Sequence, residues 1–129
     1  GFFDEALVSI VRQGKEGQEE IARMMTQYRN NPPQSLGGSP VITVKDYLTG
    51  ESLDVKSGRK TPIDMEKSNV LQFITADSTI VSIRPSGTEP KIKFYFGVRG
   101  ELCCEDKFEE TRQTMERKIE SIKQEMKLI

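Results

Sequence analysis

The spacing of apolar positions changes along the chain, and these changes predict where helices and strands lie. Residues 2–12 have the spacing of a helix, with apolar side chains at Phe3, Ala6, Leu7, Ile10 and Val11. Gly14 is a plausible stop for this helix. A second helix is predicted over residues 16–29, where acidic residues stand near the start, as the helix dipole favours. Its apolar face consists of Ile21, Met24, Met25 and Tyr28.

A loop and then a strand-rich region follow the two predicted helices. Residues 30–40 hold two Asn, three Pro and two Gly, which predicts a loop or linker. Beyond it the period becomes two, and strands are predicted over residues 41–47, 70–75, 79–84 and 91–98, with a short piece at Leu53 and Val55. In the last strand Ile92, Phe94, Phe96 and Val98 share one face, and Lys91, Lys93 and Tyr95 share the other.

The C-terminal segment predicts a long amphipathic helix over residues 105–127. Its apolar positions are Phe108, Met115, Ile119, Ile122 and Met126, which we interpret as a face packed on a sheet. Short connections between the strands favour antiparallel pairing. The sequence therefore predicts an α+β fold: an antiparallel sheet of roughly four strands with helices on one face, preceded by N-terminal helices. We place N-terminal helices and linker in residues 1–38, and the domain itself in residues 39–129.

Composition excludes several classes of function. With 19 basic and 20 acidic residues the net charge is −1, which lacks the basic excess that non-specific nucleic-acid binding requires. The absence of histidine excludes His-based catalytic triads and His-ligated metal sites. No run of about 18 apolar residues is long enough to span a membrane. Cys103 and Cys104 are adjacent, which we interpret as two reduced thiols of a cytoplasmic protein.

The segment between the last two predicted strands has the chemistry of an anion site. Its candidate residues are Arg84, Ser86, Gly87, Thr88 and Lys93. The guanidinium offers a planar fork of donors, the two hydroxyls are donors, and the glycine lets the backbone approach a ligand closely. Glu89 works against anion binding unless it points away or accepts hydrogen bonds from sugar hydroxyls. The same composition also suits a plain hairpin turn without a ligand.

A resemblance favours the anion site. Residues 82–93 read SIRPSGTEPKIK, which is similar to the phosphate-binding loop in the C-terminal domain of the α-D-phosphohexomutases, the family of phosphoglucomutases and phosphomannomutases. Residues 15–17 and 28–33 resemble the segment that enters this domain in the longer phosphoglucomutase branch. The resemblance implies a TATA-binding-protein-like fold. It also implies that Arg84, Ser86, Gly87 and Thr88 hold the substrate phosphate that does not react, while Lys93 stands where many members have Arg.

In this family the full enzyme has four domains, and the resemblance implies that the phosphoserine, the magnesium-binding loop and the sugar-reading loop lie in the first three. We find none of these motifs here, and we interpret the start at Gly1 as that of a fragment. We therefore expect a phosphate-binding domain of a phosphosugar mutase, with no catalytic residue, no metal or cofactor of its own and no activity alone. Magnesium is expected in the full-length enzyme. The expected partners are the phosphosugar and the other three domains, and neither nucleic acid nor membrane.

Two alternatives remain open from the sequence. One is a free-standing module that binds anions or phosphate esters without an enzymatic role. The other is a structural domain in which the loop of residues 84–93 is only a turn.

Overall fold

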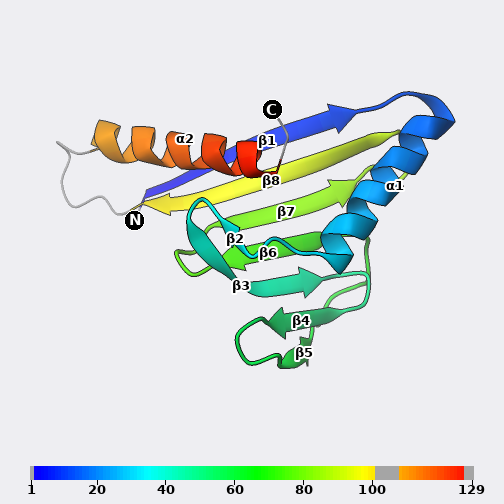
Figure 1. Ribbon diagram of the computed structural model, residues 1–129, viewed down its shortest axis with the longest axis horizontal. Coiled ribbons are helices and arrows are strands. Elements are labelled where there is room, and N and C mark those ends of the chain that lie inside the picture. Colours follow the sequence, from blue (N-terminus) through cyan, green and yellow to red (C-terminus); the bar gives the residue numbers. More distant parts are fainter. Residues whose placement is uncertain (1, 101–107, 127–129) are drawn as a thin grey trace.

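The structure, a computed structural model, describes residues 2–100 and 108–126 (Figure 1). It has an antiparallel sheet and two helices, which confirms the predicted α+β class. In chain order the elements are β1 (Phe2–Val11), α1 (Gly14–Asn30), β2 (Ser35–Leu36), β3 (Ser39–Asp46), β4 (Glu51–Asp54), β5 (Lys60–Pro62), β6 (Leu71–Thr75), β7 (Ile80–Pro85), β8 (Lys91–Gly100) and α2 (Phe108–Glu125).

The sheet is larger than the four strands predicted. Seven strands follow the order β1-β8-β7-β6-β3-β4-β5, and β2 pairs with β3 beside this path. The four predicted strands correspond to β3, β6, β7 and β8, which form the centre of the sheet. The short strands β2 and β5 lie in segments rich in turn residues, and pairing with longer neighbours holds them in place. A local pattern of two or three residues does not reveal such pairing.

The predicted helix over residues 2–12 is wrong, because this segment forms strand β1. All ten residues of β1 pair antiparallel with β8, from Phe2 opposite Gly100 to Val11 opposite Lys91. The side chains alternate: Ala6, Val8 and Ile10 pack against the core, whereas Leu7 and Val11 are exposed. The apolar positions of this segment fit both the helical period of 3.6 residues and the strand period of two. Pairing with the long strand β8 stabilises the strand. Residues 2–30 therefore share one sheet and one core with the rest of the described chain. The division at residue 38 stays a prediction.

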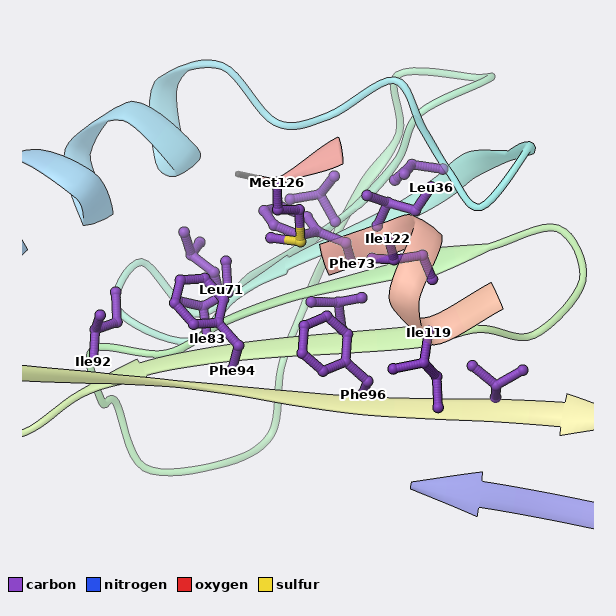
Figure 2. Close-up of a cluster of buried hydrophobic side chains, with 14 of the residues drawn as sticks. Leu36, Leu71, Phe73, Ile83, Ile92, Phe94, Phe96, Ile119, Ile122 and Met126 are labelled. Atoms are coloured by element: carbon purple, nitrogen blue, oxygen red, sulfur yellow. The ribbon is translucent and has the colours of Figure 1, made fainter. Parts of the chain in front are cut away.

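Both helices cover the same face of the sheet, as predicted (Figure 1). Helix α1 buries Ile21 and Met25, and its start and end lie close to those expected. Helix α2 buries Met115, Ile119 and Ile122, and Met126 is buried directly after its end. These side chains belong to one core cluster with buried residues of β6, β7 and β8 (Figure 2). Of the helices in the described ranges, none is both long and apolar enough to cross a membrane. The predicted thiols of residues 103 and 104 lie outside the described residues.

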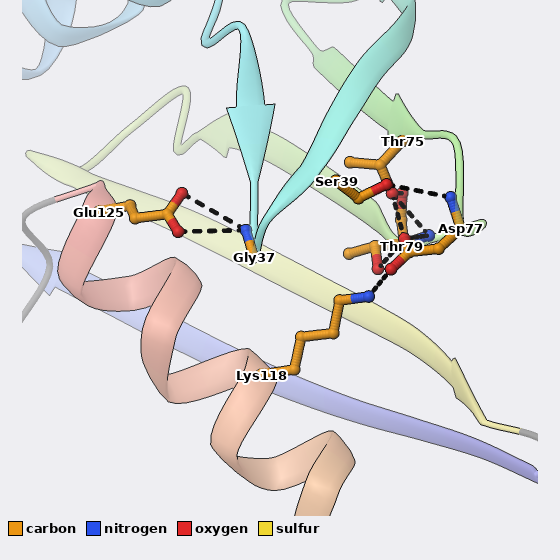
Figure 3. A network of polar contacts seen from close by, with 7 residues as sticks. All are labelled: Gly37, Ser39, Thr75, Asp77, Thr79, Lys118 and Glu125. Carbon is orange, nitrogen blue, oxygen red and sulfur yellow. Dashed lines mark hydrogen bonds and ion pairs between the residues drawn. The ribbon is translucent and has the colours of Figure 1, made fainter.

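Polar contacts fix α2 against two turns of the sheet (Figure 3). Lys118 forms an ion pair with Asp77 in the turn between β6 and β7, and the same carboxylate accepts hydrogen bonds from Thr75 and Thr79. About two turns further along α2, Glu125 accepts a hydrogen bond of 3.2 Å from the backbone N–H of Gly37, between β2 and β3. These contacts hold the helical layer on one side, so the opposite face of β7 and β8 is left open for other contacts.

Candidate functional site

The loop between β7 and β8 closes a hairpin and is ordered by one serine. The backbone N–H of Ser86 donates to the carbonyl of Lys91 at 2.8 Å, which extends the hairpin ladder past Pro85. The hydroxyl oxygen of Ser86 accepts hydrogen bonds from the N–H groups of Thr88, at 3.3 Å, and Glu89, at 3.2 Å. A serine that accepts from N–H groups two and three residues ahead is a typical turn-forming contact. Ser86 therefore shapes the loop and still has a hydroxyl proton to donate.

Two cationic side chains stand directly opposite each other where the loop begins. Arg84 on β7 pairs in register with Lys93 on β8, and both side chains lie on the face away from the helices. Like charges in such a cross-strand pair are destabilising. Within the described ranges no carboxylate forms an ion pair with Arg84, Lys91 or Lys93. A bound anion would relieve this repulsion.

The loop and the two strand ends enclose a hollow of about 500 Å³. Its lining residues are Arg84, Pro85, Ser86, Gly87, Glu89, Lys91, Lys93 and Tyr95. Three of them are cationic and one is a carboxylate, so the hollow has an excess of positive charge. A fork of guanidinium donors, a hydroxyl and ammonium groups around an open volume can bind a phosphate-sized anion. Among residues 2–100 and 108–126 no three His, Cys, Asp or Glu side chains form a group that could hold a metal ion.

Most of the predicted site residues meet in this hollow. Arg84, Ser86, Gly87 and Lys93 line it together, whereas Thr88 is exposed and is not among the lining residues. An added Cβ at Gly87 would have no heavy atom within 4 Å, so the fold itself leaves room for a side chain there. The fold thus does not require a glycine at this position, and the predicted reason for Gly87 is the close approach of a ligand. Whether these residues hold phosphate stays a prediction.

Tyr95 is a further lining residue of the hollow that was not among the predicted site residues. The alternation along β8 puts Tyr95 on the same face as Lys93, and this signal was visible in the sequence. In the structure Tyr95 lines the hollow and is 42% exposed. The hollow therefore extends along β8 beyond the motif.

The first turn of α1 and the residues just before it contact the far end of the loop. The N–H of Arg12 donates to the carbonyl of Pro90 at 2.7 Å. Gly17 is buried here, and an added Cβ would lie 2.8 Å from the Cβ of Arg12 and 3.2 Å from the Cβ of Pro90. Arg12 is in turn paired with Glu20 at 3.0 Å. The absence of a side chain at Gly17 lets the helix approach the loop closely.

The fold and this hollow define an α+β domain with a cationic site at the end of a hairpin. The family model described as the phosphoglucomutase/phosphomannomutase C-terminal domain matches residues 38–102. The chain therefore belongs to the phosphoglucomutase/phosphomannomutase family, of which it carries the C-terminal domain.

Named relatives agree with this assignment. Phosphoglucomutase from Staphylococcus aureus strain MRSA252 is 39% identical over 99 residues, which cover 77% of this chain and 18% of that protein. The corresponding protein of strain bovine RF122 / ET3-1 is 38% identical with the same coverage. The chain thus spans 18% of the length of these curated relatives.

Proposed function

We propose that this domain binds the phosphate group of a phosphosugar that is not being transferred, as part of a phosphosugar mutase. The observation that carries the proposal is the pair of cations, Arg84 opposite Lys93, without a carboxylate partner in the described ranges and at the mouth of the 500 Å³ hollow. The names of the relatives support a sugar phosphate as the substrate class. The domain itself supplies no catalytic residue, and the chain alone binds without catalysing.

The contribution of the site to catalysis is positioning. Binding energy from a remote phosphate can orient the rest of the substrate, so that its reacting oxygen meets the transferring group in another domain. In this proposal the other three domains supply that group, the magnesium ion and the loop that reads the sugar. Lys93 supplies charge without the two parallel hydrogen bonds that Arg can form, so Arg84 is the principal donor.

The test is a titration of this chain with inorganic phosphate, followed by amide chemical shifts. Replacing Arg84 with Ala removes a charge-assisted hydrogen-bond donor, which is worth about 1.5–3 kcal/mol, so we expect phosphate to bind about 10- to 150-fold more weakly. Arg84→Lys should recover only part of this loss. The unfolding midpoint should stay the same or rise slightly, since the Arg84 side chain is exposed and its removal relieves the repulsion with Lys93.

Arg59→Ala is the matched control, because Arg59 is also exposed but does not line the hollow. It removes the same charge and should leave phosphate binding nearly unchanged. If Arg84→Ala weakens binding no more than Arg59→Ala, the site assignment is wrong. The same conclusion holds if Arg84→Ala unfolds the domain while the folded fraction keeps its phosphate affinity.

A further inference from the structure

A second hollow lies next to the cationic one on the open face of the sheet. It has a volume of about 460 Å³ and is mostly apolar. Its lining includes Glu5, Leu7, Ile80, Ser82, Tyr95 and Gly97.

Gly97 explains why this hollow exists. It lies in a row across three strands, opposite Glu5 on β1 and Ile80 on β7. By the alternation along β8, position 97 belongs to the open face. Gly97 is itself buried at the base of the hollow, and glycine has no side chain to fill the space there. Glycine inside a strand weakens it and often marks a place where a ligand or another backbone approaches.

Tyr95 belongs to both hollows and connects them. Along β8 the order is Lys93, Tyr95 and Gly97, and residues two apart on a strand are about 7 Å apart. A phosphate held near Lys93 and a ring in contact with Tyr95 would thus be adjacent groups of one small molecule. The two hollows together have one charged end and one mostly apolar end.

The lining of the second hollow fits a sugar ring better than a purely hydrocarbon group. Leu7, Ile80 and the ring of Tyr95 supply apolar surface, which suits the C–H face of a pyranose. The carboxylate of Glu5 and the hydroxyl of Ser82 are polar groups at the same hollow, which suit hydroxyl groups. Ser82 already accepts a hydrogen bond from Gln72 at 3.0 Å, which fixes its position.

We propose that Tyr95 and the space above Gly97 form a subsite for the sugar ring of the phosphosugar. The subsite rests on the proposed phosphate site, because the phosphate group fixes where the ring falls. Tyr95 touches the ring through its aromatic face, so its hydroxyl is dispensable for the contact.

Two ligands of equal charge test the subsite on this chain: methyl phosphate, a monoester without a ring, and glucose 6-phosphate. The wild-type chain should bind glucose 6-phosphate more tightly. Tyr95→Ala should weaken glucose 6-phosphate about 3- to 10-fold, as expected for the loss of an aromatic contact, and should weaken methyl phosphate clearly less, although Tyr95 also lines the cationic hollow. Tyr95→Phe should bind both ligands as the wild type does.

Two further variants complete the test. Gly97→Ala adds a side chain at the floor of the hollow and should also weaken glucose 6-phosphate selectively. Leu48→Ala is the control, because Leu48 is 46% exposed, close to the value for Tyr95, and lines neither hollow. Thermal unfolding of each variant checks that it is folded.

Each contrary outcome has a distinct meaning. If methyl phosphate binds and glucose 6-phosphate binds no better, the sugar subsite is wrong while the phosphate site stands. Equal weakening of both ligands by Tyr95→Ala would assign Tyr95 to the phosphate site and overturn the subsite. No change in either ligand on Tyr95→Ala and Gly97→Ala would leave the hollow to some other occupant and also overturn it. If the wild-type chain binds neither ligand, the proposed function itself fails.

Discussion

At the scale of single residues, Ser86 and Thr88 have the same functional group in different positions. The oxygen of Ser86 accepts two backbone N–H groups and lines the cationic hollow, whereas Thr88 is exposed outside the lining. Ser86→Ala should therefore weaken the binding of inorganic phosphate about 10-fold or more, because it removes a donor to a charged ligand and the contacts that shape the loop.

Thr88→Val is the matched comparison, since it removes a hydroxyl from the same loop and keeps the shape of the side chain. We expect it to weaken phosphate less than about threefold, less than one hydrogen bond to a charged group contributes. Amide chemical-shift titrations of the two variants measure the difference. Equal losses for both would mean that the loop closes over the ligand and brings Thr88 into the site, as the family resemblance predicts.

At the scale of the elements, a long alternating pattern predicted an individual strand, whereas the pairing between strands could not be predicted from the sequence. The alternation of Ile92, Phe94 and Phe96 predicted β8, and the residues are fully buried or nearly so. The helix predicted over residues 2–12 was wrong because the apolar positions of this segment fit both the helical period and the strand period. Only the ten residue pairs with β8 favour the strand. Such a choice depends on residues about 90 positions away in the chain, which no local pattern contains.

The candidate site divides in the same way. The motif of residues 84–93 predicted Arg84, Ser86, Gly87 and Lys93 as site residues from local turn and anion chemistry, and these four residues line one hollow. The opposition of Arg84 and Lys93 depends on the register of β7 and β8, which the sequence alone did not fix. Tyr95 was missed because it stands outside the motif, although its face was predicted correctly.

The approach of α1 to the loop leads to a prediction about Gly17. An added Cβ would lie 2.8 Å from the Cβ and 3.0 Å from the backbone carbonyl carbon of Arg12, so the helix or the chain before it must shift. Overpacking costs about 1–3 kcal/mol, and the higher helix propensity of Ala returns up to about 1 kcal/mol. Gly17→Ala should thus lower the free energy of unfolding by about 1 kcal/mol and weaken phosphate binding through Pro90.

Urea unfolding of Gly17→Ala and of Gln18→Ala measures this effect. Gln18 is exposed at the next position of α1, so its replacement by Ala should leave the stability unchanged or slightly raised. A Gly17→Ala protein that is more stable than the wild type would show that the contact between α1 and the loop is not tight.

At the scale of the whole molecule, Tyr28 joins both helices to the sheet. Its ring lies against Phe94, with centroids 6.0 Å apart, and against Phe73, at 6.4 Å. Its hydroxyl donates to the carbonyl of Met126 at 3.3 Å, beyond the end of α2. One side chain of α1 thus contacts the residue that follows α2 and two central strands, so its ionisation should affect global unfolding.

The pH dependence of stability tests this position. Burial raises the pKa of the Tyr28 hydroxyl above its ordinary value of 10.0. Above pH 10 the unfolded chain releases this proton while the folded chain keeps it, so the contribution of Tyr28 is present below pH 10 and is lost as the pH rises towards the folded pKa. Burial also lowers the pKa of Lys118 from 10.5. Just below pH 10.5 the unfolded chain therefore binds more protons at Lys118 than the folded chain does, and the free energy of unfolding rises with pH.

The contribution of Lys118 cancels in the difference between the free energies of unfolding of the wild type and Tyr28→Phe, because both proteins contain this lysine. At pH 8 the wild type should be more stable by about 0.5–1.5 kcal/mol, the net value of one hydrogen bond. This advantage should shrink between pH 10 and 11, since only the wild type has the buried hydroxyl. Urea unfolding at intervals from pH 8 to 11 measures the difference. If it stays constant across that range, the hydroxyl ionises as readily in the folded protein as in the unfolded chain, and Tyr28 does not lie in a desolvated junction.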